Sequence, residues 1–133
     1  MAGTTDAAPG GTETILLVED EDLVRGFVVR VLTAKGYAVH AMPNPARAIE
    51  FAEAWPGRID LVLTDVVLPE MSGREMMTRL QQRRPEGKVL YMSGYDDSAI
   101  VHHGVIDEGT AFLPKPFTAD ALARKVREVL DGR

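Results

Sequence analysis

Four short apolar runs in this chain each end in, or lead into, a polar residue that can take part in chemistry. The pairs of run and polar residue are 14–18 with Glu19–Asp20, 59–64 with Asp65, 88–92 with Ser93, and 110–113 with Lys115. If the runs are parallel strands of one sheet, these side chains meet at the edge where open α/β sheets bind ligands. Clustered carboxylates repel one another unless a cation lies among them, so the pattern predicts a site for a hard divalent cation such as Mg2+.

Helical patterns alternate with these apolar runs along the whole chain. We expect five strands, at 14–19, 37–42, 59–65, 88–92 and 110–113, each followed by a helix. Asn44–Pro45, Ser72–Gly73–Arg74–Glu75 and Thr118 are typical of helix starts, and the helix expected at 96–105 has the weakest pattern. Strict alternation predicts an α/β fold with a parallel sheet covered by helices on both faces.

Length and composition limit the number of domains and the kinds of partner. The 133 residues suffice for one domain, and we expect a tail or linker remnant at 1–12 followed by a domain at 13–133. The net charge of −5 argues against binding to nucleic acid, which needs concentrated Lys and Arg. Cysteine is absent, and no apolar stretch is long enough to cross a bilayer, so we expect a cytoplasmic protein without direct membrane contact.

Each polar residue at the strand ends also has an ordinary structural explanation. Asp20 could cap a helix, Ser93 could belong to a turn, and Lys115 could be a solvated loop lysine. The functional interpretation depends on their combination at adjacent strand ends. A carboxylate such as Asp65 beside Mg2+ can act as a nucleophile toward phosphorus, with Lys115 supplying positive charge and Ser93 a hydrogen bond.

The motifs ILLVEDED, LVLTDVVLPEMSG, VLYMSGYDD and FLPKPF, in this order, resemble the receiver domain of two-component response regulators. The resemblance covers about residues 14–131 and implies a flavodoxin-like, doubly wound (βα)5 sheet with strand order 2-1-3-4-5. Its C-terminal segments are most similar to receivers of hybrid sensor histidine kinases, and a stand-alone receiver is the close alternative.

The resemblance also implies a role for each residue of the site. Asp65 would be the phosphoacceptor, and Mg2+ would be held by Glu19, Asp20, Asp65 and the backbone carbonyl of Val67. Ser93 and Lys115 would contact the phosphoryl group, Ser93 and Phe112 would be the switch residues, and Pro116 would follow a cis peptide bond. The donor would be a histidine kinase or a histidine phosphotransfer protein, and the receiver a monomer or weak homodimer. Such a domain is not an enzyme beyond its own phosphorylation and dephosphorylation.

Two other functions share some of these features. A pseudo-receiver, which is never phosphorylated, is disfavoured because every residue of the phosphorylation site is present. A metal-dependent phosphatase of the haloacid dehalogenase type would need a second acid two residues after the nucleophile, where this chain has Val67.

Overall fold

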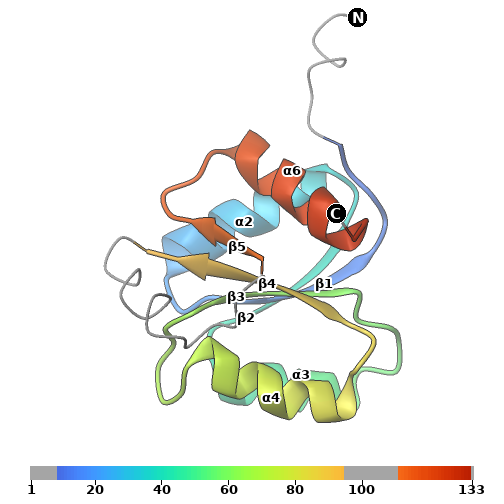
Figure 1. Ribbon diagram of the computed structural model, residues 1–133, viewed down its shortest axis with the longest axis vertical. Helices are drawn as coiled ribbons and strands as arrows, with labels where there is room; N and C mark the ends of the chain where they lie inside the picture. Colours follow the sequence, from blue (N-terminus) through green and yellow to red (C-terminus); the bar gives the residue numbers. More distant parts are fainter. Residues whose placement is uncertain (1–8, 95–110, 133) are drawn as a thin grey trace, which may run out of the picture.

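The computed structural model describes residues 9–94 and 111–132, which form one parallel sheet with helices on both faces (Figure 1). The sheet has five strands in the order β2-β1-β3-β4-β5, as the family resemblance implied. The strands are β1 (Thr14–Val18), β2 (Ala38–Met42), β3 (Leu61–Asp65), β4 (Lys88–Ser93) and β5 (Phe112–Pro114). The described helices are α2 (Asp22–Ala34), α3 (Pro45–Ala54), α4 (Gly73–Arg83) and α6 (Ala119–Leu130). The helix expected at 96–105 lies outside the described residues.

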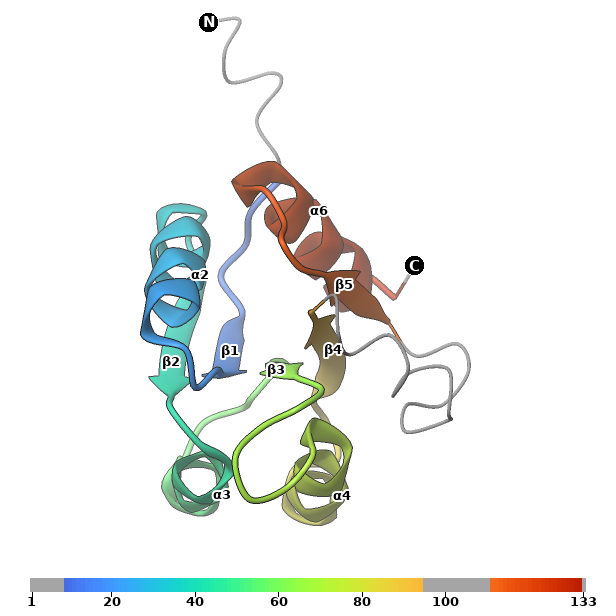
Figure 2. The same cartoon turned by 90° about the vertical axis from the view of Figure 1, so that its left-hand side faces the viewer.

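Helices α2 and α6 cover one face of the sheet, and α3 and α4 cover the other (Figure 2). Strand β1 is buried because helices cover both faces of the sheet, and its side chains alternate between the two cores. Ile15 and Leu17 belong to the core beneath α2 and α6, whereas Leu16 and Val18 belong to the core beneath α3 and α4. This alternation fixes the register of the central strand and therefore the position of the residues that follow it.

Three of the helix starts expected from the sequence have the predicted side-chain caps. The side chains of Asn44, Ser72 and Thr118 accept hydrogen bonds from backbone N–H groups in the first turns of α3, α4 and α6. Helix α2 begins differently, because Glu21 at its N-cap makes no such bond. The start of α2 therefore depends on other contacts, described below.

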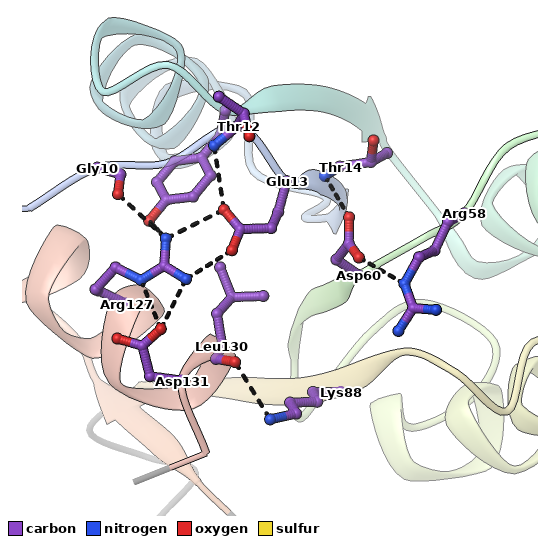
Figure 3. Close-up of polar contacts among 11 residues, drawn as sticks. Gly10, Thr12, Glu13, Thr14, Arg58, Asp60, Lys88, Arg127, Leu130 and Asp131 are labelled. Atoms are coloured by element: carbon purple, nitrogen blue, oxygen red, sulfur yellow. Dashed lines mark hydrogen bonds and ion pairs between the residues drawn. The ribbon is translucent and has the colours of Figure 1, made fainter.

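The end of the predicted tail is bound to the domain. Gly11 donates a backbone hydrogen bond to Lys35 at 3.1 Å, and Arg127 of α6 donates to the Gly10 carbonyl at 3.1 Å. Arg127 also forms an ion pair with Glu13 at 2.6 Å (Figure 3). A Cβ atom at Gly11 would lie 2.2 Å from Glu13 Oε1 and 2.4 Å from Arg127 Nη1, so a larger residue there would require these two side chains to move. These contacts attach Gly10 and Gly11, at the end of the predicted tail, to α6 and to Lys35.

Candidate functional site

The C-terminal ends of four strands lie at one edge of the sheet and carry the polar residues expected there. Glu19 and Asp20 follow β1, Asp65 ends β3, Ser93 ends β4, and Lys115 follows β5. Because β1, β3, β4 and β5 are consecutive neighbours in a parallel sheet, these residues meet although they are far apart in sequence.

Backbone contacts hold Asp65 in place. The hydroxyl of Thr64 donates to the Asp65 carbonyl at 3.1 Å, and the next residue, Val66, donates its N–H to the Met92 carbonyl at 3.0 Å. A Cβ atom at Gly73 would lie 2.1 Å from the Asp65 carbonyl oxygen. Glycine at this position therefore allows the start of α4 to pack directly against the backbone of Asp65.

Three carboxylates form a cluster whose geometry fits a divalent cation. Oxygen atoms of Glu19, Asp20 and Asp65 lie within 4.8 Å of one another. Glu19 and Asp65 are buried, while Asp20 is exposed. The Oδ1 atom of Asp65 is buried and has no hydrogen-bond partner among the described residues. A buried carboxylate oxygen without a donor is a suitable ligand for Mg2+, which prefers oxygen ligands and retains some of its waters.

Lys115 lies between the two buried carboxylates. Its Nζ atom is 2.9 Å from Glu19 Oε1 and 2.7 Å from Asp65 Oδ1. The contact with Glu19 is a hydrogen bond, whereas the contact with Asp65 is an ion pair without hydrogen-bond geometry. The backbone N–H of Lys115 donates to the Ser93 carbonyl at 2.7 Å, and the Lys115–Pro116 peptide bond is cis. The ends of β4 and β5 are thus joined directly beside the cluster.

The cluster shifts the acid–base properties of its members in different directions. Burial, together with the neighbouring Glu19, raises the pKa of Asp65 from 3.8 to about 8, although Lys115 opposes this. Burial also acts to raise the pKa of Glu19, but hydrogen bonds from Asp65, the Glu21 N–H and Lys115 outweigh it and lower the pKa. Burial acts to lower the pKa of Lys115, but Asp65 and Glu19 raise it overall, so the ammonium stays charged. Without a cation, the site therefore favours a proton on Asp65.

The remaining predicted residues occupy different environments. Ser93 is 5% exposed and lies at the site edge, and Val67 is 45% exposed. Phe112 is 38% exposed at the start of β5, so its side chain is turned at least partly outward in this structure.

Two contacts were not foreseen from the sequence. The Thr64 hydroxyl supports the backbone of Asp65, and Arg25 donates a hydrogen bond to the Glu19 carbonyl at 2.9 Å. A cation six residues after an acid at the start of a helix is a weak signal. It becomes informative only once the turn between them is known.

Comparison with known proteins identifies the family. Residues 15–127 match the model of the response regulator receiver domain. This chain belongs to that family. The receiver is 41% identical over 121 residues to sensor kinase CckA of Brucella abortus, and 33% identical over 116 residues to the response regulator receiver protein CpdR of the same organism. These matches cover 91% and 87% of the receiver, but 13% of CckA and 95% of CpdR.

Solved structures agree with this assignment. The receiver domain of the hybrid histidine kinase CckA is 32% identical, with a TM-score of 0.73 over 88% of this chain and 98% of that one. A response regulator receiver protein of Sinorhizobium medicae is 28% identical, with a TM-score of 0.78 over 91% of this chain and 96% of that one. The receiver also spans 32% of a cyclic di-GMP phosphodiesterase of Thermotoga maritima, so its relatives include much longer proteins.

Family membership makes this a receiver domain of two-component signalling, and the receiver family is not one of classical enzymes. Receiver domains use Mg2+ at an acidic site, and those of hybrid kinases interact with histidine kinases or phosphotransfer proteins. Among the described residues, no helix is both long and apolar enough to cross a membrane.

Proposed function

We propose that Asp65 accepts a phosphoryl group from a phosphohistidine in a reaction that depends on Mg2+. The observation that carries this proposal is the buried Oδ1 atom of Asp65, which accepts no hydrogen bond among the described residues and lies beside two further acids and the ammonium of Lys115. Glu19, Asp20, Asp65 and the Val67 carbonyl would hold the cation. When bound, Mg2+ neutralises charge on the phosphoryl oxygens and on the acids around the nucleophile.

The transfer exchanges one bond to phosphorus for another. A carboxylate oxygen of Asp65 forms a bond to phosphorus while the bond from phosphorus to the imidazole nitrogen breaks. The imidazole keeps the electron pair and can then take a proton from solvent. Deprotonated Asp65 is the reactive form, so the proton that burial favours must leave before transfer.

Lys115 and Ser93 would contact the new phosphoryl group. Lys115 already lies 2.7 Å from Asp65 Oδ1, and its charge would then face phosphoryl oxygens. Ser93 is on the neighbouring strand end and carries a hydroxyl that can donate to the same group. Because the backbone N–H of Lys115 donates to the Ser93 carbonyl, a movement of one residue toward the phosphoryl group would also displace the other. Phe112, at the start of the same short strand as Pro114, would respond by repacking.

A surface beside the site suits a protein donor. A groove runs between the first turns of α2 and the segment 115–117, and apolar side chains make up most of its lining, including Leu23 and Phe27. Leu23 is 85% exposed and adds to the apolar surface of this groove. Lys115 is part of the lining and also contacts Asp65, so a helical partner bound in the groove would have its phosphohistidine near Asp65.

The wider setting is part of the same proposal. The similarity to CckA favours a receiver that exchanges phosphate with a histidine kinase or a histidine phosphotransfer protein in the cytoplasm. The domain would signal as a monomer or weak homodimer through protein contacts, without binding nucleic acid, and its only reactions would be its own phosphorylation and dephosphorylation.

Intact-mass measurement after incubation with acetyl phosphate tests the proposal. We expect a gain of one phosphoryl group that requires Mg2+, is lost with EDTA and is absent in Asp65→Asn. Asp60→Asn is the matched control, because Asp60 lies just before the opposite end of the same strand and should leave the gain intact. If the mass does not change although Mg2+ binds, and a phosphorylated histidine protein also fails as donor, the domain is an unphosphorylated interaction module. Steady release of phosphate from many esters would instead indicate a phosphatase.

A further inference from the structure

Four acids in a row, Glu19–Asp20–Glu21–Asp22, form the turn after β1 and the first residue of α2. The first two belong to the carboxylate cluster, but the other two are not part of it. Adjacent like charges repel one another, and helix α2 lacks the side-chain cap that α3, α4 and α6 possess. Some other contact must therefore hold this turn in the shape that brings the first two acids to the site.

Arg25 provides one such contact, besides the hydrogen bond from the Glu19 N–H to the Met42 carbonyl at 3.1 Å. One guanidinium nitrogen, Nη1, donates to the Glu19 carbonyl at 2.9 Å, and the other, Nη2, lies 2.5 Å from Asp22 Oδ1. The Arg25 side chain is only 23% exposed, whereas that of Asp22 is 87% exposed. A single planar group thus joins the two ends of the acidic turn, one through the backbone and one through a side chain.

The contact of Arg25 with the Glu19 carbonyl matters because the side chain of Glu19 is held by hydrogen bonds and that of Asp20, among the described residues, is not. Glu19 is fixed by its own side chain, since Oε1 accepts from Lys115 at 2.9 Å and Oε2 accepts from the Glu21 N–H at 3.0 Å. The Asp20 carboxylate has no hydrogen bond or ion pair within the ranges that the structure describes. Its position is set by the backbone, and the peptide unit that leads into Asp20 is the one whose carbonyl Arg25 binds.

We propose that Arg25 is a positioning residue for the Mg2+ site, and that it acts by fixing the backbone that presents Asp20. This inference rests on the proposed metal site. Lysine cannot replace arginine here, because an ammonium is a single point of charge and cannot bind a carbonyl and a carboxylate in a fixed fork. Asp22 is the less important of the two partners, because its exposed carboxylate is largely screened by solvent.

Isothermal titration of the wild-type chain and its variants with MgCl2 tests the role of Arg25 directly. We expect Arg25→Met and Arg25→Lys to raise the Mg2+ dissociation constant by about tenfold, as is usual when support for a metal ligand is lost. The backbone amide resonance of Asp20 should shift in both variants without metal. Arg30→Met is the matched control, because Arg30 is an exposed arginine on the same helix, and it should leave Mg2+ affinity unchanged. Asp22→Asn should weaken binding by less than about twofold.

Phosphorylation by acetyl phosphate separates positioning from chemistry. In Arg25→Met, the Mg2+ concentration for half-maximal rate should rise by the same factor as the dissociation constant, while the rate at saturating Mg2+ stays close to that of the wild type. If the wild type binds Mg2+ and Arg25→Met and Arg25→Lys bind it equally tightly, the positioning role of Arg25 is wrong, but the metal site stands. If the wild-type chain binds no Mg2+, the metal site itself fails, and the role of Arg25 fails with it. Urea denaturation of each variant establishes that the compared proteins are folded. If Arg25→Met does not fold, Arg25→Lys is used for the same comparison.

Discussion

Replacement of Asp65 by asparagine should stabilise the metal-free protein at neutral pH. The carboxyl of Asp65 is almost fully buried beside Glu19, and these surroundings raise its pKa to about 8. An unfolded chain ionises the same group near 3.8. At pH 7 the folded protein must therefore either hold a proton that the unfolded chain releases or bury a charge, and both options cost free energy. Asparagine has a similar shape and no charge to bury.

The magnitude follows from the difference between the two pKa values. Each pH unit between the unfolded pKa and neutral pH contributes about 1.4 kcal/mol, which gives an upper limit of about 4 kcal/mol at pH 7. The asparagine amide must still find partners near Glu19 and Lys115, which costs roughly 1 to 2 kcal/mol. We therefore expect the free energy of unfolding to rise by about 2 to 3 kcal/mol, a large part of the stability of a small domain.

The same reasoning fixes the pH dependence. A raised folded-state pKa contributes stability that is complete below the unfolded pKa of 3.8 and is lost as pH rises toward about 8. The advantage of the Asp65→Asn variant should thus be small near pH 4 and should grow steadily toward neutral pH. Saturating Mg2+ should stabilise the wild type more than the variant, because the cation neutralises the acids at their site.

Urea denaturation followed by circular dichroism, with EDTA and at several pH values, measures these differences. Asp60→Asn is the control. Asp60 accepts a hydrogen bond from the Thr14 N–H and forms an ion pair with Arg58 (Figure 3), so its replacement should not stabilise the protein. Equal stabilities of wild type and Asp65→Asn at pH 7, or a difference that does not shrink toward pH 4, would refute the account of a buried, proton-binding carboxyl.

Three further predictions concern other parts of the molecule. Gly73→Ala should destabilise the fold by about 1 to 3 kcal/mol in urea denaturation, because its Cβ would lie 2.1 Å from a backbone carbonyl oxygen. Gly26→Ala in α2 should be neutral or stabilising, because its Cβ would only be in ordinary van der Waals contact, 3.5 Å from the Arg30 guanidinium. Glu13→Gln should lower the free energy of unfolding by about 1 kcal/mol at neutral pH, because the hydrogen bond from Arg127 lowers the pKa of Glu13. This loss of stability should disappear as pH falls through the lowered pKa, and a loss that stays the same in acid would contradict the ion pair. Leu23→Ser should slow phosphotransfer from a phosphorylated histidine protein about tenfold without slowing phosphorylation by acetyl phosphate; equal slowing with both donors would exclude a docking role.

The order of strands and helices could be read from the sequence because it depends on local patterns. Apolar runs with turn residues between them predicted the strands, and Asn44, Ser72 and Thr118 predicted three helix starts that the structure confirms. Each of these signals arises from residues within a few positions of one another. The polar residues at strand ends could be predicted for the same reason, because the end of an apolar run can be located without knowing which strands lie beside it.

The contacts between those ends could not be read in this way. Lys115 and Glu19 are 96 residues apart, and their hydrogen bond exists only because the chain places their strand ends at one edge of the sheet. The exposure of Leu23 is a similar case, because only the packed structure shows that this apolar residue of α2 is left uncovered among the described residues.

The sequence by itself determined an alternating α/β chain whose acids, hydroxyl and lysine stand at strand ends. Only the tertiary structure decided that Asp65 Oδ1 lacks a hydrogen bond among the described residues, that Arg25 binds the turn before α2, and that Gly10 and Glu13 are bound to Arg127 of α6. The physical reason is that periodicity and capping are local, whereas burial, ion pairing and close backbone approach depend on which distant segments the parallel sheet makes neighbours.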